Sequence, residues 1–239
     1  MKHIDNFIRF LDSDEQTETF EIIGPWRDSI VWASKTGEKY NILKQYDARR
    51  EISIEQLCEY HWLQSKYAEI LNETFCEIPE EFWMVYYLGE AVSKITVSIL
   101  ELPQETIFHR EMAGEKKGRL VSELPYISGN TLLEWREDTS KKYRTNKITE
   151  QERKQLEMDR CLVEMTVKSC LRNIGIPIMG WKQFTEWYPL CLENVKLVKT
   201  EDNVLQTVVT DLWGDIRQML EYERWWKKNI FPSPSNDRL

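Results

Sequence analysis

The first half of the chain alternates apolar and polar positions in short runs, as β-strands do when one face is buried. The runs cover residues 20–23, 29–34, 40–44, 83–88, 95–100 and 120–124. Gly24-Pro25 and residues 36–39 supply turn signals between the first three runs. Residues 101–118 are polar and are expected to form a loop. The pattern predicts that this half of the protein is built mainly from strands.

One long helix is predicted among these strands, over residues 54–71. Ser53 precedes it and is a suitable N-cap, because its hydroxyl can accept a hydrogen bond from the first helical turn. The apolar positions fall on one helical face, at Leu57, Tyr60, Leu63, Tyr67 and Leu71.

The second half of the chain changes from strand patterns to helix patterns. Residues 132–136 are expected to form a short helical piece, followed by a charged, apolar-poor linker over 137–149. Thr149 and Glu152 have the spacing of a capping box and predict the start of a long helix. A final helix is expected over 216–229. A strand-rich half followed by a helix-rich half predicts an α+β fold of two packed parts.

Within this second half, two short apolar runs, 195–198 and 208–209, flank a polar turn at 200–203 and predict a β-hairpin. Asn194 enters the hairpin, and Asp211 leaves it, followed by Leu-Trp-Gly. Amide and carboxylate oxygens on a rigid hairpin are the hard ligands that a magnesium-nucleotide site needs. The alternative is a surface hairpin with ordinary polar ends.

Composition and charge narrow the class of protein. The 239 residues, 41% hydrophobic and 30% charged, fit one large soluble domain or two small lobes. The formal net charge of -8 argues against a general nucleic-acid binder, so no nucleic-acid partner is expected. Five cysteines without a Cys-x-x-Cys pair indicate reduced thiols and a cytoplasmic setting. No stretch is long and apolar enough to predict a membrane span.

Several residues follow the order in which protein kinases carry their nucleotide-binding groups. Lys44 ends the third strand, and Glu59 lies fifteen positions later on the next helix. Residues 121–132 run from a strand into Gly-Asn-Thr-Leu, as the segment between kinase lobes does. Asn194 and Asp211 then match the two metal ligands. Because all of these features occur in the order of one fold, the chain resembles the protein-kinase fold.

Within the kinase-like group, the chain is most similar to the small PhoP-regulatory-network proteins of the YrbL type. Those proteins also end in a Trp-rich basic helix, like residues 223–228 here, and the resemblance covers roughly residues 20–230. It implies a bilobal fold with a β-rich N-terminal lobe and a reduced, mainly helical C-terminal lobe. The implied parts are an extension over 1–19, the N-terminal lobe over 20–127 with the helix 54–71, the C-terminal lobe over 128–231 with the hairpin 194–211, and a flexible tail over 232–239.

The resemblance also implies that ATP and Mg²⁺ bind between the two lobes. Lys44 would hold the nucleotide phosphates, and Glu59 would orient Lys44. Glu123 belongs to the segment whose backbone groups would meet adenine. Asn194 and Asp211 would bind the metal ion.

The sequence departs from the kinase pattern in three places. Gly24 stands alone where kinases have a glycine-rich loop, and Arg27 is left as a source of positive charge for the phosphates. The His-Arg-Asp triplet is absent, so Glu186 is the nearest carboxylate for a catalytic role; its alternative is a solvated surface acid. About twenty-five residues follow Gly214, too few for the usual peptide-binding helices.

Three functions fit these features. The first is an atypical kinase-like protein that binds a nucleotide, with weak or altered phosphotransfer. The second is a pseudokinase that acts by binding a protein partner, which the missing glycine-rich loop and catalytic Asp favour. The third is a non-catalytic α+β interaction or regulatory module whose match to kinases is accidental. Stabilisation by magnesium-ATP separates the first from the third.

Overall fold

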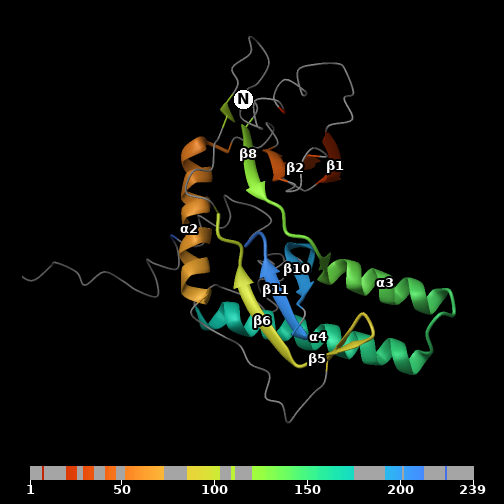
Figure 1. The fold of residues 1–239 in the computed structure, drawn as a ribbon. Coiled ribbons are helices and arrows are strands. Elements are labelled where there is room, and N and C mark those ends of the chain that lie inside the picture. The colour runs from red at the N-terminus through yellow and green to blue at the C-terminus, as the bar shows by residue number, and fades with distance from the viewer. Residues whose placement is uncertain are drawn as a thin grey trace, which may run out of the picture. The chain divides into compact units, whose positions relative to one another are not determined.

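The computed structural model describes residues 7, 20–25, 29–34, 41–46, 52–72, 85–102, 109–110, 120–174, 192–200, 202–212 and 224. Its mixed content, with a strand-rich first part and two long helices later, confirms the predicted α+β class (Figure 1). The chain divides into two compact units that interleave in sequence. The first unit contains residues 1–63, 102–126 and 215–239, and the second contains 64–101 and 127–214. No helix formed by the described residues combines the length and the apolar character that crossing a membrane requires.

Some predicted features lie outside the described residues. These are the loop residue Arg27, the candidate catalytic residue Glu186 and the tail 232–239. Of the predicted helix 216–229, the structure describes Arg224, which is helical. Of residues 1–19, it describes Phe7, which is also helical and is fully buried.

The first unit contains an antiparallel sheet with the strand order β1-β2-β3-β8-β7. The strands are β1 (Phe20–Pro25), β2 (Ser29–Ser34), β3 (Asn41–Tyr46), β7 (His109–Arg110) and β8 (Leu120–Pro125). The strands predicted from alternation are confirmed here to within two residues at their ends. The predicted loop 101–118 is corrected, because His109 and Arg110 pair with β8 and extend the sheet by a short edge strand.

One face of this sheet carries an aromatic core. Leu43 is fully buried among Phe7, Phe20 and Val121, with Trp32 packed against them. The Phe7 ring meets the rings of Phe20 and Trp32 edge to face, at centroid distances of 5.0 and 5.5 Å. Alternation along β3 therefore places Leu43 in this core and sends Lys44, the next residue, to the other face of the sheet.

The predicted helix 54–71 is confirmed as α2 (Ile54–Asn72), and the boundary between the two units falls within it, after Leu63. Its first turn is capped as expected. The N–H of Gln56 donates to Ser53 Oγ at 3.2 Å, and the N–H of Ser53 donates to Gln56 Oε1 at 3.0 Å. This reciprocal pair of bonds is a capping box, which satisfies two backbone donors at the helix start.

The second unit contains a four-stranded sheet in the order β6-β11-β10-β9 (Figure 1). Its strands are β6 (Lys94–Ile99), β9 (Asn130–Thr131), β10 (Val195–Lys199) and β11 (Val204–Val209). β6 and β11 are parallel, whereas β10 pairs antiparallel with both β9 and β11. The buried amide of Gln64 donates to the carbonyls of Leu100 and Thr210, at 3.0 and 3.2 Å, and so joins the segments that leave the two parallel strands.

Two helices, α3 (Leu132–Arg144) and α4 (Glu150–Asn173), pack side by side in this unit (Figure 1). The capping box predicted at Thr149 and Glu152 is confirmed at the start of α4. The predicted linker over 137–149 is wrong, because α3 continues to Arg144. A second capping box, between Thr131 and Glu134, starts α3.

α3 is long although its sequence contains few apolar residues, because it buries only a narrow stripe. It buries only Leu132, Trp135 and Thr139, so most of its surface is free to be polar. An ion pair between Asp138 and Lys142, at 2.7 Å, links neighbouring turns on the exposed side. A helix with one narrow buried stripe needs few apolar residues, and its sequence therefore reads as a linker.

A short hairpin of β4 (Val85–Tyr87) and β5 (Glu90–Val92) replaces the single strand predicted over 83–88. The chain reverses through Leu88 and Gly89, whose φ angles are 54° and 88°. Two positive φ angles in a two-residue loop are the signature of a type I′ turn, which favours Asn or Gly. A leucine in this conformation costs about 1–2 kcal/mol, and the side chain of Leu88 is 60% exposed.

The β4–β5 hairpin is joined to α4 by Asp159, whose side chain is buried. The N–H of Tyr86 donates to Asp159 Oδ2 at 3.1 Å, and Gln155 Nε2 donates to Oδ1 at 2.9 Å. Burial raises the pKa of Asp159, while these two hydrogen bonds act in the opposite direction. The carboxylate therefore holds the β4–β5 hairpin to α4 at some cost in desolvation.

The raised pKa of Asp159 predicts a pH-dependent stability. Protonation is easier in the folded state, so its contribution is fully present below the unfolded pKa of about 3.9 and is lost as the pH rises through the folded pKa. Relative to Asp159→Asn, the unchanged protein should lose stability between about pH 3.5 and pH 7. Urea unfolding of both proteins at the two pH values measures this, and a pH-independent difference between them would contradict it.

Cysteine usage differs from the expectation of reduced thiols. Cys58 and Cys161 are free, but Cys170 on α4 is disulfide-bonded. The spacing of cysteines along the chain could not reveal this bond, because pairing depends on which cysteines the fold brings within reach. Disulfides are uncommon in the cytoplasm, so cysteine usage no longer supports a cytoplasmic setting.

Candidate functional site

The hairpin that carries the two predicted metal ligands is present in the second unit. β10 and β11 pair in register from Val195 opposite Val209 to Lys199 opposite Leu205. At the turn, the N–H of Thr200 donates to the carbonyl of Val204 at 2.9 Å, and Asn203 adopts a φ of 57°. Asparagine tolerates this left-handed conformation better than most residues, which explains its place in the turn.

Asn194 and Asp211 lie together at the open end of this hairpin. Asn194 is buried and ends a short 3-10 turn, η2 (Leu192–Asn194), directly before β10. Its carbonyl accepts hydrogen bonds from the N–H of Thr210 at 2.8 Å and from Thr210 Oγ1 at 3.2 Å. Thr210 immediately precedes Asp211, and Leu212 after it is buried. The Thr210 hydrogen bonds before Asp211 and the buried Leu212 after it therefore hold the chain in place around the predicted ligands.

The donor set at this end of the hairpin fits a hard cation. Asn194 offers an amide oxygen and Asp211 a carboxylate oxygen, and Mg²⁺ prefers oxygen ligands. Mg²⁺ is usually bound through one or two protein groups, with waters and substrate phosphates completing its octahedron. In the part of the chain that the structure describes, no three or more His, Cys, Asp or Glu side chains form a group that could hold a metal ion.

Lys44 lies on β3 in the first unit, opposite Ser122 on β8 and opposite Val31 on β2. Its ammonium lies 5.5 Å from the centroid of the Tyr46 ring. The charge of Lys44 also acts on His61 of α2. The pKa of His61 is lowered to about 4, mainly by burial and secondly by the positive charge of Lys44. His61 is therefore neutral at physiological pH, and the charge of Lys44 is felt on the α2 side of the sheet.

This placement of Lys44 makes a prediction for His61. Replacing Lys44 with methionine should raise the pKa of His61, because a nearby positive charge no longer opposes its protonation. The pKa should stay below the ordinary value of about 6.5, because burial is the larger cause. NMR titration of the histidine ring protons measures it, with His61→Gln identifying the signal. An unchanged pKa in Lys44→Met would place the ammonium away from His61.

Glu59 and Glu123, the other two residues predicted to serve the nucleotide site, lie on different elements of the first unit from Lys44. Glu59 on α2 forms an ion pair with Arg224 at 3.0 Å, and both side chains are substantially exposed. Glu123 on β8 is the register partner of Leu43. Because partners in an antiparallel pair share a face, the Glu123 side chain projects from the face opposite to Lys44. The role predicted for Glu123 uses its backbone, which lies in the strand beside Lys44.

The structure thus brings together two subsets of the predicted residues. Lys44 and Glu123 occupy neighbouring strands of the first unit, and Asn194 and Asp211 share a hairpin end in the second. The convergence of the two subsets on one nucleotide stays a prediction, as do the roles of Arg27 and Glu186.

Sequence reasoning missed two buried polar residues on α2, His61 and Gln64. Neither residue has a role in the sequence-based predictions. A signal was present, because both fall on the helical face that carries Leu57, Tyr60 and Leu71. A polar residue on a buried helical face needs a partner, which Gln64 finds in the carbonyls of Leu100 and Thr210.

This chain shows little similarity to known protein families, curated proteins or solved structures. No protein-family model matches this chain, and no curated protein matches it. Among solved structures, it is similar to the kinase domain of Mycobacterium tuberculosis PknI, with a TM-score of 0.33 and 11% sequence identity. The match covers 84% of this chain and 62% of that kinase domain, so the chain spans less than two thirds of its length. The finer resemblance to YrbL-type proteins stays a prediction.

Proposed function

We propose that this chain is an atypical kinase-like protein that binds a magnesium-nucleotide, with weak or altered phosphotransfer. The observation that supports this proposal is the open end of the β10–β11 hairpin. There, hydrogen bonds between Thr210 and Asn194 hold an amide and a carboxylate at the same strand ends. Asn194 and Asp211 would bind Mg²⁺, and the nucleotide phosphates would supply further oxygen ligands.

The other predicted site residues would act on the phosphates, the adenine and the attacking hydroxyl. Lys44 would neutralise the phosphates, with Arg27 adding positive charge and Glu59 orienting Lys44. The backbone at Glu123 would meet the adenine. Glu186 would accept the proton of an attacking hydroxyl. Phosphoryl transfer depends mainly on positioning and electrostatic stabilisation, so the absence of a His-Arg-Asp triplet would slow the reaction without preventing it.

A second candidate function is a non-catalytic interaction or regulatory module, which includes a pseudokinase that binds a protein partner. The observation that favours it is on α4, where Met158 and Met165 are 50% and 67% exposed. They are seven positions apart and therefore lie on one helical face. Flexible methionine side chains are common on surfaces that bind partners.

Thermal unfolding of the whole chain tests the first proposal. Magnesium-ATP should raise the melting temperature, because a ligand that binds only the native state stabilises it by mass action. ATP with a chelator and Mg²⁺ alone should each give much smaller shifts. If magnesium-ATP gives no shift, the interaction module becomes the better account.

Transfer of labelled phosphate separates the two nucleotide-binding versions. Label from γ-phosphate-labelled ATP should appear slowly on the protein itself or on an added small molecule if the chain is an active kinase-like enzyme. A magnesium-ATP shift without any transfer would assign the chain to the pseudokinases.

A further inference from the structure

Gln64 is a buried polar side chain on α2, in the part of this helix that belongs to the second unit. Only 1% of its surface is exposed. Its amide Nε2 donates to the carbonyl of Leu100 at 3.0 Å and to the carbonyl of Thr210 at 3.2 Å. A side-chain amide has two N–H donors, so both donors of Gln64 are used and the side chain is held in one orientation.

The two carbonyls that Gln64 binds lie just beyond the ends of the parallel strands β6 and β11. The N–H of Leu100 still donates to the carbonyl of Val209, at 2.8 Å, and so continues the pairing of these strands by one residue. The carbonyls of Leu100 and Thr210 are bound by Gln64 instead of by a strand. A backbone carbonyl that leaves a sheet inside a protein needs a donor from elsewhere, and Gln64 supplies one to each.

Thr210 is held by both of its backbone groups, and Asp211 is the next residue. The N–H of Thr210 donates to the carbonyl of Asn194 at 2.8 Å, and its carbonyl accepts from Gln64. The peptide group that joins Thr210 to Asp211 is planar, so a bond to the Thr210 carbonyl fixes the orientation of this plane and with it the position of the Asp211 Cα. The bond from Gln64 therefore fixes the point from which the Asp211 side chain extends.

The proposed Mg²⁺ ion is sensitive to the placement of its ligands. Mg²⁺ requires nearly ideal octahedral geometry, with oxygen ligands at about 2.0–2.1 Å, whereas Ca²⁺ accepts irregular geometry at about 2.3–2.6 Å. A carboxylate whose backbone can rotate would lose part of its fit to Mg²⁺ but would still suit Ca²⁺. The preference between the two ions therefore reports how firmly Asp211 is held, separately from the stability of the fold.

We propose that Gln64 is a positioning residue for the metal site. By fixing the peptide group between Thr210 and Asp211, it holds the Asp211 carboxylate in the place that Mg²⁺ requires. Gln64 acts through Thr210 and touches neither the metal ion nor the nucleotide. This role rests on the proposed function, since it requires that a magnesium-nucleotide binds at the open end of the β10–β11 hairpin.

Calorimetric titration of the full chain with magnesium-ATP and with calcium-ATP tests the role of Gln64. Gln64→Met keeps an unbranched side chain of similar length but removes both donors. It should weaken magnesium-ATP binding at least about tenfold and calcium-ATP binding at most about threefold, because Mg²⁺ tolerates a displaced carboxylate less well than Ca²⁺ does. The measured quantity is the ratio of the two dissociation constants.

Thr207→Val is the first matched control. Thr207 is fully buried, and its Oγ1 donates to the carbonyl of Thr96 at 2.8 Å. Valine has the shape of threonine without the hydroxyl, so this variant also takes a side-chain donor away from a backbone carbonyl of the second unit. It should lose stability, as Gln64→Met does, but should keep the ratio of dissociation constants, because Thr207 is not bonded to the peptide group before Asp211. Urea unfolding of both variants measures the losses of stability.

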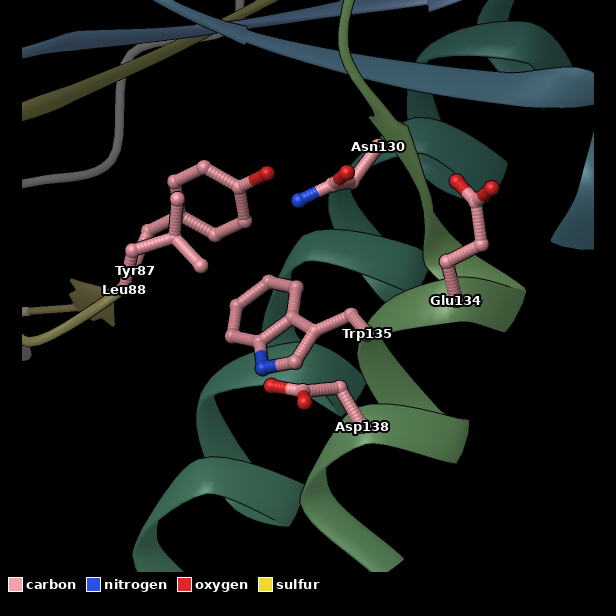
Figure 2. A pocket seen from close by; sticks show the side chains of 6 residues that line it. All are labelled: Tyr87, Leu88, Asn130, Glu134, Trp135 and Asp138. Carbon is pink, nitrogen blue, oxygen red and sulfur yellow. The ribbon is translucent and has the colours of Figure 1, made fainter. Parts of the chain in front are cut away.

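A second control comes from a pocket of about 380 Å³ within the second unit, lined by Tyr87, Leu88, Asn130, Glu134, Trp135 and Asp138 (Figure 2). There, the buried side chain of Tyr87 is hydrogen-bonded to that of Asn130. The N–H of Ser93, directly after β5, donates to the carbonyl of Asn203 at 3.1 Å, so the β4–β5 hairpin lies beside the turn of β10–β11, at the end opposite Asp211. Tyr87→Phe should therefore also keep the ratio.

The outcomes separate the role of Gln64 from the proposed function. If the unchanged protein binds neither ATP complex, the proposed function fails and the role of Gln64 fails with it. If it binds magnesium-ATP but Gln64→Met keeps the ratio, or the controls change the ratio as much, the role is overturned while nucleotide binding stands. Should Gln64→Met fail to fold, as judged by circular dichroism, Gln64→Asn replaces it. Its amide is one methylene too short to reach both carbonyls, and an unchanged ratio in this variant would likewise overturn the role.

Discussion

Replacing Asp211 with alanine should abolish the thermal stabilisation that magnesium-ATP gives to this protein. The carboxylate is the charged member of the two proposed metal ligands, and Mg²⁺ binds weakly to a neutral amide alone. A ligand present at a hundred times its dissociation constant stabilises the native state by about 2.7 kcal/mol. For a chain of this size, that corresponds to a rise of roughly 5–10 °C in melting temperature, all of which should be lost.

The control for this measurement lies on the same hairpin. Asp202 is an exposed acid at the turn between β10 and β11, at the end opposite Asp211. Asp202→Ala removes the same charge from the chain and should keep the full shift. Asp211→Asn, which retains an oxygen donor without the charge, should keep a small part of it. A full shift in Asp211→Ala would remove Asp211 from the nucleotide site.

Replacing Gly129 with alanine should destabilise the protein by about 3–5 kcal/mol, which combines overpacking with backbone strain. Gly129 has a φ of 135°, and a Cβ there would lie 2.3 Å from the carbonyl oxygen of Leu197. The backbone fixes both positions, beside the place where β9 pairs with β10, so neither atom can turn aside. The carbonyl of Gly129 also accepts a hydrogen bond from Lys196 Nζ at 3.1 Å. Urea unfolding measures the loss.

Gly89→Ala is the matched control for this prediction. Gly89 also has a positive φ, of 88°, but a Cβ there would meet no atom within 4 Å. This variant therefore carries only the conformational cost, about 1 kcal/mol. Equal losses in the two variants would mean that the close approach of Gly129 to β10 contributes nothing.

Local signals predicted the elements whose determinants lie within a few residues. The capping groups at Ser53 and Thr149 were identified from sequence, because a helix start is set by side chains three positions apart. The β10–β11 hairpin was identified in the same way, from two apolar runs around one polar turn. The candidate ligands Asn194 and Asp211 share the open end of this hairpin because its two strands pair.

The same reasoning failed where burial is decided by distant parts of the chain. α3 read as a charged linker, because one narrow stripe that includes Trp135 is all that it buries. The edge pairing of β7 with β8 was hidden in a polar segment. In both cases the neighbour that covers the element is absent from the local pattern, so periodicity underestimates how much structure forms.

By itself, the sequence determined the α+β class, the length of α2 and the hairpin that carries Asn194 and Asp211, because periodicity and capping act over one or two turns of chain. Only the tertiary structure decided that β6 pairs in parallel with β11 and that Gln64 hydrogen-bonds to Thr210, 146 positions away. It also decided that Tyr87, Asn130 and Trp135 enclose one pocket. Such contacts require long loops to close, and what repays that entropy is packing summed over the whole fold, which no short window of sequence contains.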